Sequence, residues 1–312
     1  MESCRKILGP CALRLLLLAF LFHALLMFPP GTRAEETSPP KAGEDIVLAS
    51  RDATLWRPVG ASGPSPLVVF SHGYGGCPGQ STFLTYALAE AGYLVIAPRH
   101  ADAGCGVART RRSEAPFLIP SVWTDASGRD RREDIVAILE ALKQDPAFRD
   151  GIDWPKLALM GHSLGGYTVL GLAGAWPSWR IPGIAAVVAL SPTCAPFLGK
   201  GGRLDAMTAP VSFQSGTMDY GILPALIQRD GCFDQARGPA QLVLFRRAGH
   251  FAWTDLASRA HPAIVAATRG FLDAHLLGLD KEKLGQRHRG MVEVRVKSGD
   301  TDTVRTERGS DP

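Results

Sequence analysis

The chain has 312 residues, enough for one large α/β domain or two small ones. Apolar residues make up 46% and charged residues 21%, which is the composition of an ordinary globular protein and excludes a disordered chain. The formal net charge at neutral pH is +4.

The first 34 residues have the order of a secretory signal peptide, with a basic start, a short apolar core and small residues at the end. The apolar run covers residues 15–28 and is shorter than the roughly 20 residues that a membrane-spanning helix needs. An uncleaved anchor is the alternative. We therefore predict a signal peptide over residues 1–34, a mature chain beginning near Glu35, and a secreted or periplasmic protein.

Cleavage after residue 34 would remove four basic residues and one acidic residue, which lowers the formal charge from +4 to +1. A charge so close to neutral gives no global bias toward nucleic acid or an acidic membrane. We expect no nucleic-acid partner and no stable membrane anchor after cleavage. The oligomeric state has no signal in the sequence.

Four cysteines belong to the mature chain, and in an oxidising compartment they can form up to two disulfides. Three pairings are possible. We favour Cys77–Cys105 and Cys194–Cys232, because each pair would link loops that leave neighbouring strands.

Helix-compatible segments alternate with buried apolar runs through much of the chain, which is typical of a doubly wound, mostly parallel sheet flanked by helices. We predict one catalytic domain over residues 45–277. Residues 278–312 are expected to be a charged C-terminal tail, either disordered or adding a short strand at Val292–Val296.

In chain order, the sequence predicts a flexible lead-in (35–44), two strand-like segments forming an edge hairpin (46–50 and 53–56), a buried strand (67–70), a helix (82–91), a second buried strand (93–98), a long loop (98–128), an amphipathic helix (129–144), a strand, sharp turn and helix (157–172), three further strands (184–190, 211–216 and 242–245) and a final helix (260–277).

The sharp turn carries the sequence Gly-His-Ser-Leu-Gly, with Ser163 at its centre. In a G-x-S-x-G turn between strand and helix, the glycines allow close packing and the serine hydroxyl is held above the sheet edge. This pattern also arises by chance, and the alternative is a serine that only caps the helix. A catalytic role for Ser163 would require a base, an acid and an oxyanion hole elsewhere in the chain.

A base and an acid follow later strands, where ligand sites of open α/β sheets lie. His250 follows the strand 242–245, whereas the other seven histidines lie in the signal, the tail or the last helix, adjoin Ser163, or precede it in the chain. Asp219 directly follows the strand 211–216 and is the expected acid. The order Ser163, Asp219, His250 is that of Ser…Asp…His hydrolases of this fold. Other aspartates considered are Asp102, Asp205, Asp230 and Asp234.

An oxyanion hole needs one N–H from the residue after the nucleophile and one from the loop after an early strand. The first is Leu164. The second is Tyr74, in a glycine-flanked turn after the strand 67–70, although such a turn can also be no more than a tight turn.

With these residues the chain resembles the α/β-hydrolase superfamily. Within it, the chain is similar to bacterial secreted esterases of the dienelactone-hydrolase-like and platelet-activating-factor-acetylhydrolase-like group and to cutinase-type polyester hydrolases. Dienelactone hydrolases proper use a cysteine where this chain has Ser163, and the animal acetylhydrolases place their acid where this chain has Ser191. The resemblance rests on LVVFSHGYGG (67–76), AEAGYLVIAPRH (89–100), GHSLGG (161–166), SGTMD (215–219) and AGHF (248–251).

The resemblance and these residues imply a serine esterase that uses Ser163, Asp219 and His250, with no cofactor and no metal. The connection between the strands 184–190 and 211–216 is too short for a large lid domain. We therefore expect an open site for a small-molecule or lipid ester of short to medium acyl chain, with Trp123 or Trp253 either on its wall or in the core. Two alternatives are an amide or peptide hydrolase of the same fold and a non-catalytic secreted binding protein on a hydrolase scaffold.

Overall fold

The computed structural model describes residues 43–60, 62–105, 122–257, 259–299 and 304–308. By its internal contacts the chain divides into residues 1–40 and residues 41–312, and the description here concerns the second unit. The predicted signal peptide, all but the end of the lead-in, and most of the 98–128 loop lie outside the described residues.

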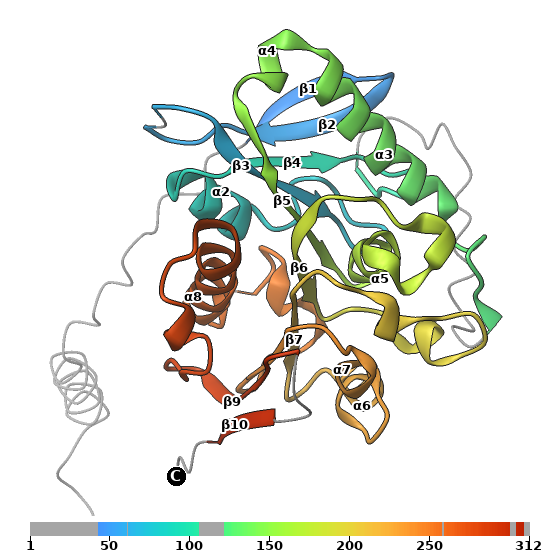
Figure 1. Ribbon diagram of the computed structural model, residues 1–312, viewed down its shortest axis with the longest axis vertical. Helices are drawn as coiled ribbons and strands as arrows, with labels where there is room; N and C mark the ends of the chain where they lie inside the picture. The colour runs from blue at the N-terminus through green and yellow to red at the C-terminus, as the bar shows by residue number, and fades with distance from the viewer. Residues whose placement is uncertain (1–42, 61, 106–121, 258, 300–303, 309–312) are drawn as a thin grey trace, which may run out of the picture. The chain divides into compact units, whose positions relative to one another are not determined.

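A ten-stranded sheet forms the centre of the described unit (Figure 1). Its strand order is β1-β2-β4-β3-β5-β6-β7-β8-β9-β10, and the six strands from β4 to β8 in this order run parallel. The predicted fold class is therefore confirmed. The strands are β1 (Glu44–Leu48), β2 (Arg51–Trp56), β3 (Ser65–Ser71), β4 (Leu94–Pro98), β5 (Ile152–His162), β6 (Ile184–Leu190), β7 (Val211–Gly216), β8 (Ala240–Phe245), β9 (Met291–Lys297) and β10 (Val304–Arg308).

Helices cover both faces of the sheet because its central strands are apolar on both sides (Figure 1). In β3, for example, the side chains of residues 67–70 are all fully buried. One apolar cluster lies beneath α3 and α5, and the other lies beneath α2 and α8. The α-helices are α2 (Thr82–Glu90), α3 (Arg129–Gln144), α4 (Pro146–Arg149), α5 (Leu164–Leu170), α6 (Leu223–Ile227), α7 (Cys232–Gln235) and α8 (His261–Leu272). Among the described residues, no helix has both the length and the apolar character needed to span a bilayer.

The C-terminal segment 278–312 contributes two strands to the sheet, in contrast to a separate tail. β9 pairs antiparallel with β8, and β10 pairs antiparallel with β9. Met291 and Val294 bury their side chains against the sheet, whereas Glu293, Arg295 and Arg308 form ion pairs with one another. Glu293 and Arg295 lie on one face of β9, which is paired on both sides, and the sheet extends beyond the predicted boundary at residue 277.

Both favoured disulfides are present. Cys77–Cys105 links the loops after β3 and β4, and Cys194–Cys232 links the loop after β6 to α7, which follows β7. Each pair of strands is adjacent in the sheet, which was the reason for the prediction. The connection between β6 and β7 contains only two short 3-10 turns, Ala195–Leu198 and Leu204–Ala206, so no lid domain is inserted there.

Candidate active site

Ser163 lies in a strained turn between β5 and α5. Its backbone has φ 55° and ψ −115°, a conformation that is costly for a residue with a side chain. A Cβ atom at Gly161 would collide with the Gly165 carbonyl, and a Cβ atom at Gly165 would collide with the Ser71 carbonyl of β3. The two glycines thus permit the close packing that holds Ser163 at the end of the strand.

The structure brings Ser163, His250 and Asp219 into one hydrogen-bonded chain. The Ser163 Oγ lies 2.9 Å from His250 Nε2. On the other side of the ring, His250 Nδ1 lies 3.2 Å from Asp219 Oδ1 and 3.3 Å from Oδ2. Asp219 follows β7 and His250 begins a 3-10 turn after β8, so the three side chains meet at the carboxyl ends of β5, β7 and β8.

A fourth side chain, Ser191, joins this chain at the end of β6. Its buried hydroxyl lies 2.8 Å from His250 Nδ1 and makes a short hydrogen bond to Asp219 Oδ2. The hydroxyl can donate to the carboxylate while its oxygen accepts from the imidazole N–H. Ser191 was not among the site residues expected from the sequence, although its place directly after a parallel strand could have indicated it.

The two expected oxyanion donors, Tyr74 and Leu164, both lie beside Ser163. Tyr74 lines the same hollow as Ser163 and His250. Leu164 is the first residue of α5; its side chain is fully buried, and its N–H belongs to the helix end where backbone donors have no intrahelical acceptor. Both N–H groups thus belong to backbone segments that adjoin Ser163.

His162 ties the loop of Tyr74 to the loop of His250. Gly73 N–H donates to Gln80 Oε1 at 2.9 Å, and Gln80 Nε2 lies 3.0 Å from His162 Nδ1. The opposite nitrogen, His162 Nε2, lies 2.9 Å from the His250 carbonyl oxygen. Burial, followed by the nearby His250, lowers the pKa of His162 to about 3, so the ring is neutral and accepts at Nδ1 while donating at Nε2. From the sequence, His162 was only set aside as a base because it adjoins Ser163, and this bridge went unrecognised.

Two hollows flank Ser163 and His250. One, of about 430 Å³, is bounded by Trp123, the loop after β6 and the segment from Met218 to Ala225. The other, of about 630 Å³, is bounded by the Tyr74 loop and the segment from Phe251 to Leu256. Trp253 is fully buried and lines neither hollow, so of the two tryptophans considered, only Trp123 lies on the wall.

Exposed apolar side chains gather around these hollows. Of the eleven large apolar side chains exposed in the described part of the chain, five line the two hollows. Such clustering is typical of a surface that contacts an apolar ligand. The five, with their exposed fractions, are Tyr74 (44%), Met218 (48%), Tyr220 (75%), Phe251 (61%) and Leu256 (85%).

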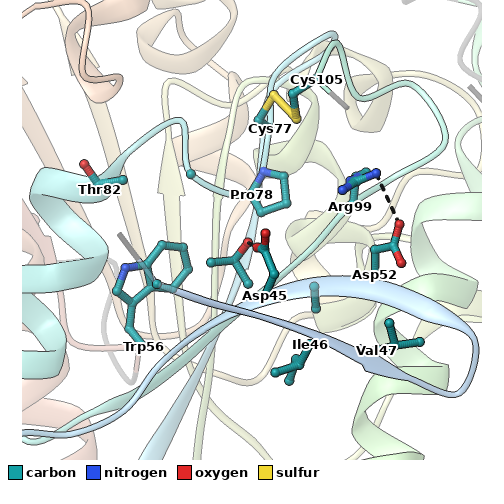
Figure 2. Close-up of a pocket in the computed structure, with 14 residues that line it drawn as sticks. Asp45, Ile46, Val47, Asp52, Trp56, Cys77, Pro78, Thr82, Arg99 and Cys105 are labelled. Atoms are coloured by element: carbon teal, nitrogen blue, oxygen red, sulfur yellow. Dashed lines mark hydrogen bonds and ion pairs between the residues drawn. A yellow bond between two sulfur atoms is a disulfide. The ribbon is translucent and has the colours of Figure 1, made fainter. Parts of the chain in front are cut away.

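A third hollow of about 620 Å³ shares Cys77 and Gly79 with the hollow beside Tyr74 (Figure 2). Its walls include Trp56 and Asp45 of the edge hairpin and Arg99, which forms an ion pair with Asp52 at 3.2 Å. None of Ser163, Asp219 and His250 lines it. No cluster of three or more His, Cys, Asp or Glu side chains among the described residues could hold a metal ion.

A family model described as the alpha/beta hydrolase fold matches residues 66–201. This stretch runs from β3 to the connection after β6, so it includes Tyr74, Ser163, Leu164 and Ser191 and ends before Asp219 and His250. No curated protein matches the chain.

Proposed function

Because this chain belongs to the alpha/beta hydrolase superfamily, we propose that it is a secreted serine esterase that cleaves carboxylic esters of short to medium acyl chain. The observation that carries the proposal is the hydrogen-bonded chain from Ser163 Oγ through His250 to Asp219. An adjacent base oriented by a third group is the arrangement that activates a serine hydroxyl.

In the proposed reaction, Ser163 Oγ attacks the ester carbonyl carbon while His250 Nε2 takes the hydroxyl proton. Asp219 holds the ring in the tautomer with Nδ1 protonated and stabilises the cation that forms. The ester C–O bond then breaks, and the alcohol leaves with the proton from His250. A water molecule, deprotonated by His250, attacks the acyl-enzyme and releases the acid.

Tyr74 and Leu164 are the proposed oxyanion donors. As the carbonyl oxygen gains negative charge, their backbone N–H groups would stabilise it without rearranging. The first turn of α5 adds the positive end of a helix dipole next to the same atom. Loss of one such donor typically raises the barrier by about 3 kcal/mol.

The proposed substrate is a small-molecule or lipid ester with an apolar group on each side of the carbonyl. Two hollows meet at Ser163 and His250, and both have exposed apolar side chains at their walls. No lid is inserted between β6 and β7, where the wall of the smaller hollow is formed. Export, through the signal peptide proposed for residues 1–34, is supported by the two disulfides, because disulfides persist in oxidising compartments.

A panel of p-nitrophenyl esters from acetate to palmitate tests the substrate class. We expect kcat/KM to be highest for esters of short to medium acyl chain and to fall for the esters of the longest chains. The reason is the size of the smaller hollow, which has a volume of only about 430 Å³. A rate that rises steadily to palmitate would contradict this expectation.

A parallel panel of aryl amides separates esters from amides. We expect the amides to react much more slowly than the matched esters, and labelling by a fluorophosphonate probe to require Ser163. Faster cleavage of the amides would assign an amidase to this site, and a protein that the probe does not label would be a binding protein on a hydrolase scaffold.

A further inference from the structure

A buried ion pair lies behind the loop that carries Tyr74. Arg131, in the first turn of α3, donates from Nε to Asp102 Oδ1 at 3.1 Å and from Nη2 to Oδ2 at 2.8 Å. The side chains are 1% and 0% exposed. Burial alone would raise the pKa of Asp102, but the charge of Arg131 brings it down to about 2, so the carboxylate is ionised. Buried ion pairs are costly to desolvate and contribute little net stability, which leaves the purpose of this one to be explained.

The remaining polar atoms of the pair hold the backbone on both sides of Tyr74. Arg131 Nη1 donates to the His72 carbonyl at 2.7 Å, and Nη2 donates to the Gly73 carbonyl at 3.2 Å. Asp102 Oδ2 accepts from Gly75 N–H at 3.3 Å. Burial, followed by the charge of Arg131, lowers the pKa of His72, and the neutral ring lies with its Nδ1 2.8 Å from the same Gly73 carbonyl oxygen.

The Gly73 carbonyl and the Tyr74 N–H are the two ends of one peptide group. The described residues contain no cis peptide bond, so this N–H points opposite to the carbonyl. Because the carbonyl faces the buried Arg131, the Tyr74 N–H faces away from it. Tyr74 lines the hollow that also contains Ser163 and His250, so this is the direction required of an oxyanion donor.

We propose that Arg131, held by Asp102, is a positioning residue for the oxyanion hole: by binding the Gly73 carbonyl, it aims and polarises the Tyr74 N–H. This inference rests on the proposed esterase function. The guanidinium makes a charge-assisted hydrogen bond to the carbonyl, and a hydrogen bond at one end of a peptide group strengthens donation at the other. A donor fixed in this way needs no reorganisation when the oxyanion forms.

The test removes the guanidinium without leaving a buried charge. In Arg131→Met/Asp102→Asn the guanidinium's hydrogen bonds to the two carbonyls are lost, while His72 Nδ1 and the Gly76 N–H still bind the Gly73 carbonyl. The site is neutral, and the amide oxygen at position 102 still accepts from Gly75. The matched control is Arg51→Met/Asp134→Asn, which likewise removes a guanidinium together with its buried carboxylate partner. Arg51 binds Asp134, which belongs to the same polar network through His100 and Ser71, but Arg51 does not contact the Tyr74 loop.

The readout is the ratio of kcat/KM for p-nitrophenyl acetate to that for its thionoester, in which the carbonyl oxygen is replaced by sulfur. Sulfur accepts hydrogen bonds weakly, so the thionoester reports the same nucleophile and base with little help from the oxyanion hole. For the double variant we expect kcat on the ester to fall about 10- to 100-fold, within the effect of losing one donor. The ester-to-thionoester ratio should fall at least 5-fold, with little change in KM. The control variant should keep the wild-type ratio.

An equal loss on both substrates, or an unchanged kcat in the folded double variant, would overturn the inference while leaving the esterase in place. If the double variant does not fold, the ratio measured on Arg131→Lys decides, since an ammonium group cannot reproduce the paired contacts to Asp102 and the two carbonyls. A wild-type protein with no ester hydrolysis dependent on Ser163 would overturn the proposed function, and this inference with it.

Discussion

Ser191 completes the hydrogen bonding around the proposed base. Its hydroxyl lies between the Asp219 carboxylate and His250 Nδ1, and its own backbone is held at φ 44°, outside the usual range for a serine. Strain of this kind persists where surrounding structure imposes it, and it gathers at functional sites. We therefore regard Ser191 as a residue that positions Asp219 and His250, although it does not touch the substrate.

Replacing Ser191 by alanine is expected to lower kcat/KM for esters about 10-fold, because one hydrogen bond to a charged group contributes roughly 1.5–3 kcal/mol. KM should change little, since Ser191 lines neither hollow. The matched control is Ser215→Ala: Ser215 is equally buried, near the end of β7, and its hydroxyl has no hydrogen-bond partner among the residues that the structure describes. Steady-state kinetics showing equal losses in the two variants would contradict a role for Ser191.

Asp130 makes the stability of the protein depend on pH. Burial, only partly offset by the charge of Arg131, raises the pKa of this carboxyl to about 6. Between about pH 4 and pH 6, Asp130 therefore keeps its proton in the folded protein, whereas the same carboxyl has lost it in the unfolded chain. The free energy of unfolding falls as the pH rises through this range. Above it, the folded protein carries a destabilising buried charge.

Asp130→Asn is accordingly expected to be more stable than the wild type at pH 7, by about 1–2 kcal/mol. At pH 4 the difference should vanish. Urea unfolding at several pH values measures the gap, and a gap that does not widen from pH 4 to pH 7 would show that Asp130 titrates normally.

Each of the two disulfides cross-links loops on one side of the proposed active site. Cys77 follows the Tyr74 loop and lines the larger hollow, and Cys194 follows Ser191 and lines the smaller one. The loops that they close span 28 and 38 residues. Loops after parallel strands carry the site here, so cross-links between adjacent loops limit the motion of both walls.

Removing Cys194–Cys232 with the double variant Cys194→Ser/Cys232→Ser should lower the free energy of unfolding by roughly 2–4 kcal/mol, the usual value for closing a loop of this size. Urea unfolding under oxidising conditions measures the loss. Because Cys77–Cys105 is intact in this variant, added reductant should lower its stability further. A variant as stable as the wild type would mean that side-chain packing, without the disulfide, is enough to stabilise the wall of the smaller hollow.

At the scale of the whole molecule, the position of the site follows from the sheet order. β3 and β5 are neighbours in the sheet, and the chain crosses to β4 on one side and to β6 on the other. The loops after β3 and β5 therefore run in opposite directions, and a crevice forms between them at the carboxyl ends of the two strands. Tyr74 and Ser163 lie in these two loops.

Much of this arrangement is predictable from sequence because it depends on local patterns. β6 is a continuous apolar run, and the buried strand β7 begins with alternating apolar and polar residues; the sequence predicts both with the observed bounds. The strained turn at Ser163 is marked by its glycines. Asp219 and His250 directly follow strands, which is why reasoning from strand ends leads to them.

Other features depend on contacts between distant segments and have no local pattern. The Gln80–His162 contact joins residues 82 positions apart, and the contact of Arg131 with the Gly73 carbonyl spans 58 positions. Arg131 lies on an amphipathic helix whose charged positions look solvated, yet it is buried. The strand β9 is nearly half charged, so the sequence left a short strand at Val292–Val296 and a disordered tail as alternatives, and the pairing with β8 selects the strand.

The central claim is that Ser163 is the nucleophile of an esterase. Its most direct test is the initial rate of p-nitrophenyl ester hydrolysis by the wild type and by Ser163→Ala, with circular dichroism to verify the fold. Without the Ser163 hydroxyl, His250 has no nucleophile to activate, and we expect kcat to fall by about a thousandfold or more. A Ser163→Ala variant that hydrolyses the ester at close to the wild-type rate would contradict the account.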